Sequence, residues 1–335
     1  MPHARFRCHL FVALLAPVVL TGCPVPDVRE DGPADRDYRR AMRDFVELIS
    51  ATARQRDADF IIIPQNGHQL LAAGDGTAAL PAASYLAAID GVGREDLFYG
   101  YESDDAPTPA AARNEILPYL AIARNAGKAV LVTDYCARRA FVDDSHVQNA
   151  ALGHLSFAAD RRELDNVPTY PAAPPNANAA DVATLSGARN FLYLLNPGAF
   201  ASREAYLRAL AGTPHDALVI DAYFDGELLT NAEVATLKTR ATGARRLVIA
   251  YMSIGEAEDY RDYWQPAWRT EPPPFVVAEN ANFAGNFVVR YWDAEWRQII
   301  VGADGYLDRL LDAGFDGAYL DIIDAFEFFE SAAER

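Results

Sequence analysis

Cysteine and basic residues are both scarce in this chain of 335 residues. Its three cysteines, Cys8, Cys23 and Cys136, do not make the even, spaced set of a disulfide-stabilised secreted domain. Lys and Arg number 30 against 47 Asp and Glu, which gives a formal net charge of -17. No segment supplies the basic face that phosphate binding needs, so the composition argues against a nucleic-acid partner.

Apolar residues, in contrast, are plentiful and make up 51% of the chain. A fraction this high can bury a sizeable core, which excludes a disordered or collagen-like chain. The length corresponds to about two average domains or one large α/β domain.

The N-terminal segment has the parts of a bacterial lipoprotein signal in their usual order. Arg5 and Arg7 precede the apolar run 10–20, which is shorter than the roughly 20 residues that span a bilayer. The sequence Leu-Thr-Gly-Cys ends the run at Cys23 and resembles the lipoprotein box, whose cysteine is acylated. An ordinary secretory signal with a chance cysteine is the alternative.

We therefore expect a signal peptide over 1–22, lipidation of Cys23 and a Pro- and Asp-rich tether over 23–37. The mature protein would cross the cytoplasmic membrane and stay anchored in the bacterial cell envelope, with the membrane as a partner. Pro24 after the cysteine leaves the choice between inner and outer membrane open.

Short apolar runs alternate with helical patterns in the rest of the chain. Residues 38–56 place Met42, Phe45, Val46 and Ile49 at helical spacing. Further helical patterns cover 109–126, 231–241 and 294–312. The predicted strands are 60–64, 88–95, 129–134, 191–196, 217–221, 247–251, 287–292 and 317–321.

Uniformly apolar strands joined by helices favour a parallel sheet with right-handed crossovers. Eight such units predict an α/β fold of the (β/α)8 TIM-barrel type over 38–335. An open, doubly wound sheet is the alternative. The Pro- and Ala-rich stretch 166–183 reads as a linker; it could separate two domains, but each would own too few strands to close a barrel.

Several longer motifs resemble a known family, the extracellular glycoside hydrolases related to endo-α-1,4-polygalactosaminidase, which are TIM barrels. They are YMSIGEAEDYRDYW at 251–264, YWDAEW at 291–296, GFDGAYLDIIDAF at 314–326, IIIPQNGHQLL at 61–71, REDLFYG at 94–100 and GKAVLVTDYC at 127–136. The resemblance covers most of the chain from about residue 40.

The order of these motifs differs from that of the family. There the stretch that resembles 190–335 comes first and the stretch that resembles 38–165 follows. The resemblance therefore implies a circular permutation, with 166–183 joining the family's two ends. On this interpretation the helix at 38–56 packs between the last predicted strand, 317–321, and the first, 60–64.

In a TIM barrel the active groups follow the carboxyl ends of the strands. Here those positions carry carboxylates, amides and aromatics rather than histidines. The chain has no H-E-x-x-H motif, cysteine cluster, P-loop or G-x-S-x-G elbow, so we expect neither a metal nor another cofactor. Paired carboxyl groups and flat rings are what glycoside hydrolysis needs.

Asp321 and Glu95 are the predicted catalytic pair. Asp321 ends an apolar strand and matches the first Asp of the family's D-x-x-D motif, and Glu95 matches its acid at a later strand end. Glu102 is the alternative second carboxylate if that strand ends later. The predicted substrate-binding residues are Asn66, Asp134, Tyr135, Asp221, Tyr251, Glu256, Trp292 and Asp324.

Helix capping is a competing role for such acids, and Asp324 could serve only as a cap. The leading hypothesis is a lipid-anchored, monomeric glycoside hydrolase acting on an amino-sugar or related polysaccharide. A non-catalytic glycan-binding barrel and a two-lobed solute-binding lipoprotein are the alternatives. The sugar, the linkage, the anomeric outcome and the endo or exo mode stay open.

Overall fold

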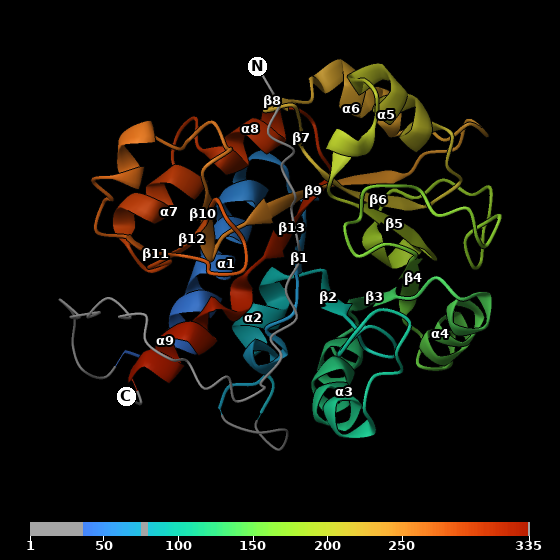
Figure 1. Cartoon of the computed structure of the whole chain (residues 1–335), viewed down its shortest axis with the longest axis horizontal. Helices are drawn as coiled ribbons and strands as arrows, with labels where there is room; N and C mark the ends of the chain where they lie inside the picture. Colours follow the sequence, from blue (N-terminus) through green and yellow to red (C-terminus); the bar gives the residue numbers. More distant parts are fainter. Residues whose placement is uncertain (1–35, 75–79, 334–335) are drawn as a thin grey trace.

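The structure, a computed structural model, describes residues 36–74 and 80–333 (Figure 1). The predicted signal peptide at 1–22, the lipidated Cys23 and all but the last two residues of the tether at 23–37 lie outside the described residues. Within the described part, no helix combines the length and the apolar character needed to cross a bilayer.

In the described residues, eight parallel strands form the centre of the molecule, in two sheets. The strands of the first sheet are, in spatial order, β1 (Ile61–Pro64), β13 (Gly317–Asp321), β9 (Leu247–Ser253), β6 (Ala217–Asp221) and β5 (Phe191–Leu194). Those of the second sheet are β2 (Gly91–Glu95), β3 (Ala129–Tyr135) and β4 (Leu155–Ala159). Nearly every residue in them is buried, as expected for strands covered on both faces.

The two sheets meet at both of their edges. A parallel bridge joins Gln65 to Gly93, and the Asn66 N–H donates to the Gly93 carbonyl at 2.8 Å, which links β1 to β2. At the other edge β4 lies in contact with β5. The first parallel strand also pairs with the last, β13. This order is compatible with a TIM barrel.

Tyrosines fill much of the space enclosed by the strands. Tyr319 of β13 is in register with Tyr251 of β9, and its ring lies 5.2 Å from that of Tyr193 on β5. Gly93 on β2 leaves room for it: a Cβ there would lie 1.9 Å from the Tyr319 hydroxyl. A side chain at position 93 would therefore displace this layer.

One predicted strand is wrong and one was missed. The run 287–292 forms β12 (Asn286–Val289), which pairs antiparallel with β10 (Glu256–Glu258) and β11 (Val276–Glu279) in a separate sheet. The missing parallel strand is β4, whose sequence LSFAA has no continuous run of large apolar residues. Leu155 and Phe157 alternate with small residues, and the neighbouring strands bury Ser156, Ala158 and Ala159.

The predicted helix 38–56 is confirmed as α1 (Tyr38–Arg56). Asp37 caps its N-terminus, because the Asp37 side chain accepts from the Arg40 N–H. It contacts α2 (Ala83–Ala88), which follows β1, and α8 (Tyr306–Asp312), which precedes β13 (Figure 1). It also packs on α7 (Ala294–Val301) and α9 (Phe326–Ala333). The predicted helix 294–312 is thus two helices, interrupted by Gly302 and Gly305.

The remaining helices are α3 (Ala110–Asn125), α4 (Arg139–Ala151), α5 (Arg203–Ala211) and α6 (Asn231–Leu237). Short 3-10 turns occur at η1 (His68–Leu71), η2 (Leu185–Gly187), η3 (Pro197–Ala199), η4 (Pro266–Arg269) and η5 (Ile323–Ala325). A small hairpin, β7 (Tyr223–Phe224) and β8 (Glu227–Leu228), follows β6.

The stretch 166–183 connects β4 to β5 without a helix of its own. It is held at the start of β6, because Asn178 donates to Asp216 at 2.9 Å and Arg240 donates to the carbonyl of Ala180. Val182 is buried in the core. The second part of this largely exposed segment is therefore fixed to the start of β6.

Candidate active site

Glu95 is the last residue of β2, and its carboxylate is surrounded by neutral donors. The Tyr135 hydroxyl at the end of β3 donates to Oε1, and the Gln65 side-chain amide donates to Oε2. Asn66 Nδ2 adds a third bond to Oε2 at 3.1 Å. Gln65 is itself fixed, because its Oε1 accepts from the Tyr193 hydroxyl at 2.7 Å.

Asp321 is the last residue of β13, next to β1 and β9. Its Oδ2 accepts from the Tyr251 hydroxyl at 2.8 Å, and its Oδ1 accepts from the Ile322 N–H at 2.8 Å. Ile322 has a φ of 57°, a left-handed conformation that a β-branched residue rarely adopts. Gly255 makes room for this turn, since a Cβ there would lie 2.0 Å from the Ile322 carbonyl oxygen.

Strained backbone of this kind recurs at three strand ends. Asn66, Asp96 and Ile322 all have φ between 55° and 59°, and they follow β1, β2 and β13. Asn and Asp accept this conformation at little cost, whereas Ile does not. Such strain is found where the surrounding structure fixes functional side chains in place.

Both carboxyl groups are almost fully buried, with Glu95 1% and Asp321 4% exposed. Burial raises the pKa of Glu95 to about 7, and the neighbouring charge of Asp96 acts in the same direction. Burial also raises the pKa of Asp321 to about 7, with the charge of Glu95 adding to the effect. Two interacting acids in this range can hold one proton between them near neutral pH.

Two more acids lie at the same end of the strands. Burial raises the pKa of Asp324 to about 8, with the charges of Glu327 and Asp321 contributing. Burial raises the pKa of Glu256 as well, although its carboxylate accepts from Asn280 at 2.7 Å and Asn286 at 3.3 Å. The β10–β12–β11 sheet therefore brings Glu256 to this cluster.

The structure places five of the predicted substrate-binding residues around or beside Glu95 and Asp321. They are Asn66, Tyr135, Tyr251, Glu256 and Asp324. Gln65, which follows β1, belongs to this group although it was not among the predicted site residues. Its position two residues beyond Ile63 gives it the same orientation, and this alternation is the signal that could have identified it.

Asp134 and Asp221 are not part of the pair's surroundings. Asp134 accepts from the Ser145 hydroxyl at 2.6 Å and from the Phe98 N–H at 2.8 Å, so it fastens the loop after β2 to α4. Asp221 forms a two-pronged ion pair with Arg261 at 2.8 and 3.1 Å. These carboxylates are occupied by structural partners.

Trp292 and Glu102 also lie elsewhere. Trp292 follows β12, outside the parallel sheets, and packs on Phe329 with 4.6 Å between ring centroids. Glu102 is exposed in the loop beyond β2. The geometry thus favours Glu95 over Glu102 as the partner of Asp321.

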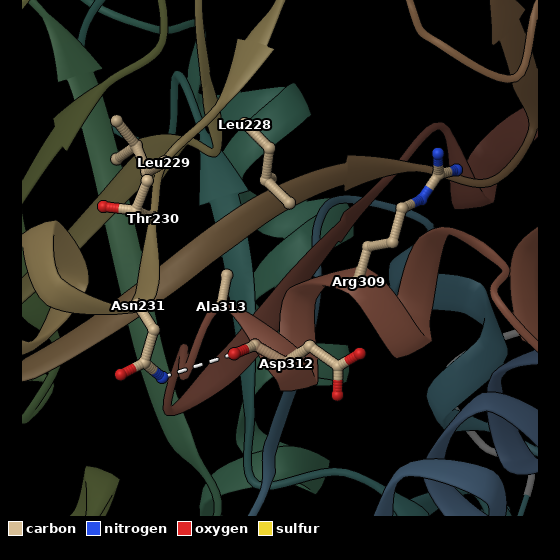
Figure 2. Close-up of a pocket in the computed structure, with 7 residues that line it drawn as sticks. All are labelled: Leu228, Leu229, Thr230, Asn231, Arg309, Asp312 and Ala313. Carbon is tan, nitrogen blue, oxygen red and sulfur yellow. Dashed lines mark hydrogen bonds between the residues drawn. The ribbon is translucent and has the colours of Figure 1, made fainter.

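Two cavities open on the helical exterior, away from the carboxyl groups. One, of about 310 Å³, lies between the start of α6 and the end of α8, where Asn231 donates to the Asp312 carbonyl at 3.3 Å (Figure 2). The other, of about 450 Å³, lies between α3 and the residues after α4. Neither is lined by a residue of the acid cluster.

Among the residues described, no group of three or more His, Cys, Asp or Glu side chains has the arrangement to hold a metal ion. Cys136 is buried and unpaired, and burial raises the pKa of its thiol.

Comparison with known proteins points to one family. Residues 171–334 match the model of glycoside-hydrolase family GH114, which supports a glycoside hydrolase. An uncharacterized protein of Methanocaldococcus jannaschii is 36% identical over 179 residues, covering 52% of this chain and 49% of that protein. Uncharacterized proteins of Deinococcus radiodurans and Thermotoga maritima are 39% and 47% identical over 125 and 81 residues.

The chain spans about half the length of the first of these relatives, and 38% and 24% of the other two. The family match contains Asp321 and Glu256, whereas Glu95 lies before its first residue. The family match therefore says nothing about Glu95, and its choice as the second carboxyl group stays a prediction.

Proposed function

We propose that this protein hydrolyses an amino-sugar or related polysaccharide, with Glu95 and Asp321 as its catalytic carboxyl groups. The observation that carries the proposal is the pair itself: two interacting acids at the carboxyl ends of β2 and β13, each held by neutral donors and each with its pKa raised to about 7. Glycoside hydrolysis needs one protonated and one ionised carboxyl group. The family match supports the same chemistry.

The surroundings assign the two roles. Glu95 lies beside the negative charge of Asp96, which favours its protonated form, so Glu95 donates a proton to the oxygen of the glycosidic bond. Asp321 accepts bonds from the Ile322 N–H and the Tyr251 hydroxyl, and both lower its pKa. In this assignment Asp321 is the ionised partner, which attacks the sugar or activates a water molecule.

The substrate class rests on the resemblance of the motifs at 251–264 and 314–326 and on the charge of the site. Glu256, Asp324 and the pair place four carboxyl groups at one end of the strands. An ammonium group on the sugar would be attracted to them in this low-dielectric position.

We further infer a closed, circularly permuted (β/α)8 barrel. Three observations support it: β1 pairs with β13, β4 contacts β5, and the family match begins at residue 171, inside the connection between β4 and β5. The contacts of α1 with α2 and α8 fit a helix that covers the join. The order of Arg5, Arg7, the apolar run and Cys23 supports a lipid anchor in the cell envelope.

The test is a screen of the purified domain, residues 36–335, against purified amino-sugar polymers, with release of reducing ends as the readout. We expect hydrolysis of a partly deacetylated galactosamine polymer and none of a neutral glucan. A folded domain that cleaves no polymer of the panel would refute the proposal.

A non-catalytic glycan-binding protein is the second candidate, and one observation favours it. The carboxyl groups of Glu95 and Asp321 are buried and already hydrogen bonded, whereas a catalytic pair must reach the substrate. Isothermal titration with the same polymers separates the two, because this candidate predicts binding without release of reducing ends.

A further inference from the structure

Asp96, the residue after Glu95, is a buried acid whose charge favours protonated Glu95 in the roles proposed above. Its side chain is 0% exposed and forms an ion pair with Arg162, whose Nη2 lies 3.2 Å from Oδ1. Its other oxygen, Oδ2, is buried without a hydrogen-bond partner. A half-satisfied buried acid is costly to keep, so its retention needs an explanation.

The ion pair is a built feature of the fold. Arg162, in the turn after β4, also pairs with Asp104 at 2.7 Å and donates to the Gly100 carbonyl at 2.6 Å. Gly100 has a φ of 113°, and a Cβ there would lie 2.3 Å from Asp96 Oδ1. The loops after β2 and β4 are thus locked together across the end of β3.

Arg162 is connected to Glu95 through the side chain of Tyr135. The Arg162 guanidinium carbon lies 3.9 Å from the centroid of the Tyr135 ring, above its face. Tyr135 in turn donates its hydroxyl hydrogen bond to Glu95 Oε1. Arg162 therefore holds the donor of Glu95, while its partner Asp96 places a negative charge one residue away from it.

We propose that Asp96 and Arg162 form a positioning pair for Glu95, in which Arg162 fixes both the carboxylate of the adjacent Asp96 and the Tyr135 ring, whose hydroxyl donates to Glu95. The inference rests on the proposed function for its purpose, because a general acid must carry its proton at the working pH. The structural part, the effect of the pair on Glu95, stands without any substrate.

The charges around Glu95 give the direction of the effect. The titratable and charged groups that face it are Asp96, Tyr135, Arg162, Tyr193, Tyr319 and Asp321. Burial raises the pKa of Asp96 itself to about 7, and its ion pair with Arg162 acts against this and favours the ionised form. Ionised Asp96 raises the pKa of Glu95, and Arg162 lowers it. Replacing Asp96 by a neutral residue removes a charge that raises the pKa of Glu95. It also leaves the positive charge of Arg162 without its partner, which lowers the pKa of Glu95 further.

The test is D96N, which keeps the shape and suits the left-handed backbone at this position. The measurement is a carbon-13 NMR titration of labelled Glu side chains, assigned with E95Q. In D96N the pH at the midpoint of the Glu95 titration should fall by about one pH unit or more. The alkaline limb of the pH–activity profile should move to lower pH by the same amount. At pH 7, kcat should therefore fall about fivefold, with little change in KM.

D104N is the matched control, because it removes the exposed partner of the same arginine, and it should leave the Glu95 midpoint where it is. D96N/R162Q removes both charges of the buried pair and provides a second folded variant. Its midpoint should lie between those of wild type and D96N.

An unchanged Glu95 midpoint in both D96N and D96N/R162Q would overturn the positioning role. The titration needs no substrate, so a wild-type protein without hydrolytic activity would refute the proposed function while leaving this result readable. A shift in D104N equal to that in D96N would also contradict the proposal, because the effect would then belong to Arg162 in general.

Discussion

Buried acids lie at both ends of the parallel strands, and Asp216 and Asp316 before the strands have other partners than Glu95 and Asp321 at their carboxyl ends. Before the strands, Asp216 is paired with Arg240 at 2.7 Å, and Asp316 is paired with Lys238 at 2.8 Å and Arg245 at 2.7 Å. After the strands, Glu95 and Asp321 have hydroxyl, amide and backbone donors, and within the described residues neither has an ion-pair partner.

This difference separates the two ion-paired acids before the strands from the proposed catalytic pair. A cation compensates a buried carboxylate and keeps it ionised, which fixes the chain but prevents proton exchange. Neutral donors leave the pKa near the working range of an enzyme.

The largest effect is expected from removing the chemistry at the carboxyl ends. E95Q and D321N keep the shape and most hydrogen bonds, and each should lower kcat/KM on the amino-sugar polymer by about 10²–10⁴-fold or more. The melting temperature should change little. E102Q, which alters an exposed acid seven positions from Glu95, is the control and should keep wild-type activity.

The corresponding change at the other end should affect stability instead. R240M leaves Asp216 buried without its cation, and the side chains of both residues are 0% exposed, so the free energy of unfolding should fall by about 3–5 kcal/mol. Urea denaturation measures it. R245M, at the 43% exposed partner of Asp316, should cost less than about 1 kcal/mol. Equal losses in the two variants would contradict the comparison.

Glu95 and Asp321, which have no cation as partner within the described residues, should also make the free energy of unfolding depend on pH. Glu95 and Asp321 have raised pKa values in the folded protein, so the folded state binds more protons than the unfolded chain between about pH 4 and 7. Their contribution to stability is present at about pH 4 and is lost as the pH rises to about 7. In urea unfolding at several pH values, the double variant E95Q/D321N should lose this slope.

Y135F should produce the smallest effect of the series. The Tyr135 hydroxyl stabilises ionised Glu95, so its removal should raise the pKa of Glu95. The alkaline limb of the pH–activity profile should then move upward by about one pH unit or less. A downward movement would show that Tyr135 acts on Glu95 in the opposite sense.

Much of the parallel fold could be predicted because its strands are continuous apolar runs between helical patterns. The exceptions have physical causes: β4 has small side chains that its neighbours bury, and the run 287–292 is equally apolar but folds back within a hairpin sheet. Apolar runs report burial, and burial alone does not say which sheet a strand joins.

The site was harder to predict because one residue of difference in strand length reverses the direction of a side chain. Asp134 and Glu95 both come at strand ends, but β3 continues to Tyr135, and this places Tyr135 beside Glu95 and turns Asp134 toward α4. Asp221 is taken by Arg261, a partner 40 positions away. Register and long-range ion pairs are set by the folded chain.

The most direct measurement is the titration of Glu95 and Asp321 themselves, by carbon-13 NMR of the labelled carboxyl groups in the free protein, assigned with E95Q and D321N. Because these acids are buried among neutral donors, both should titrate near pH 7, with the two midpoints coupled so that removal of either acid lowers the other. Two carboxyl groups that are fully ionised at pH 5, each unaffected by loss of the other, would contradict the account.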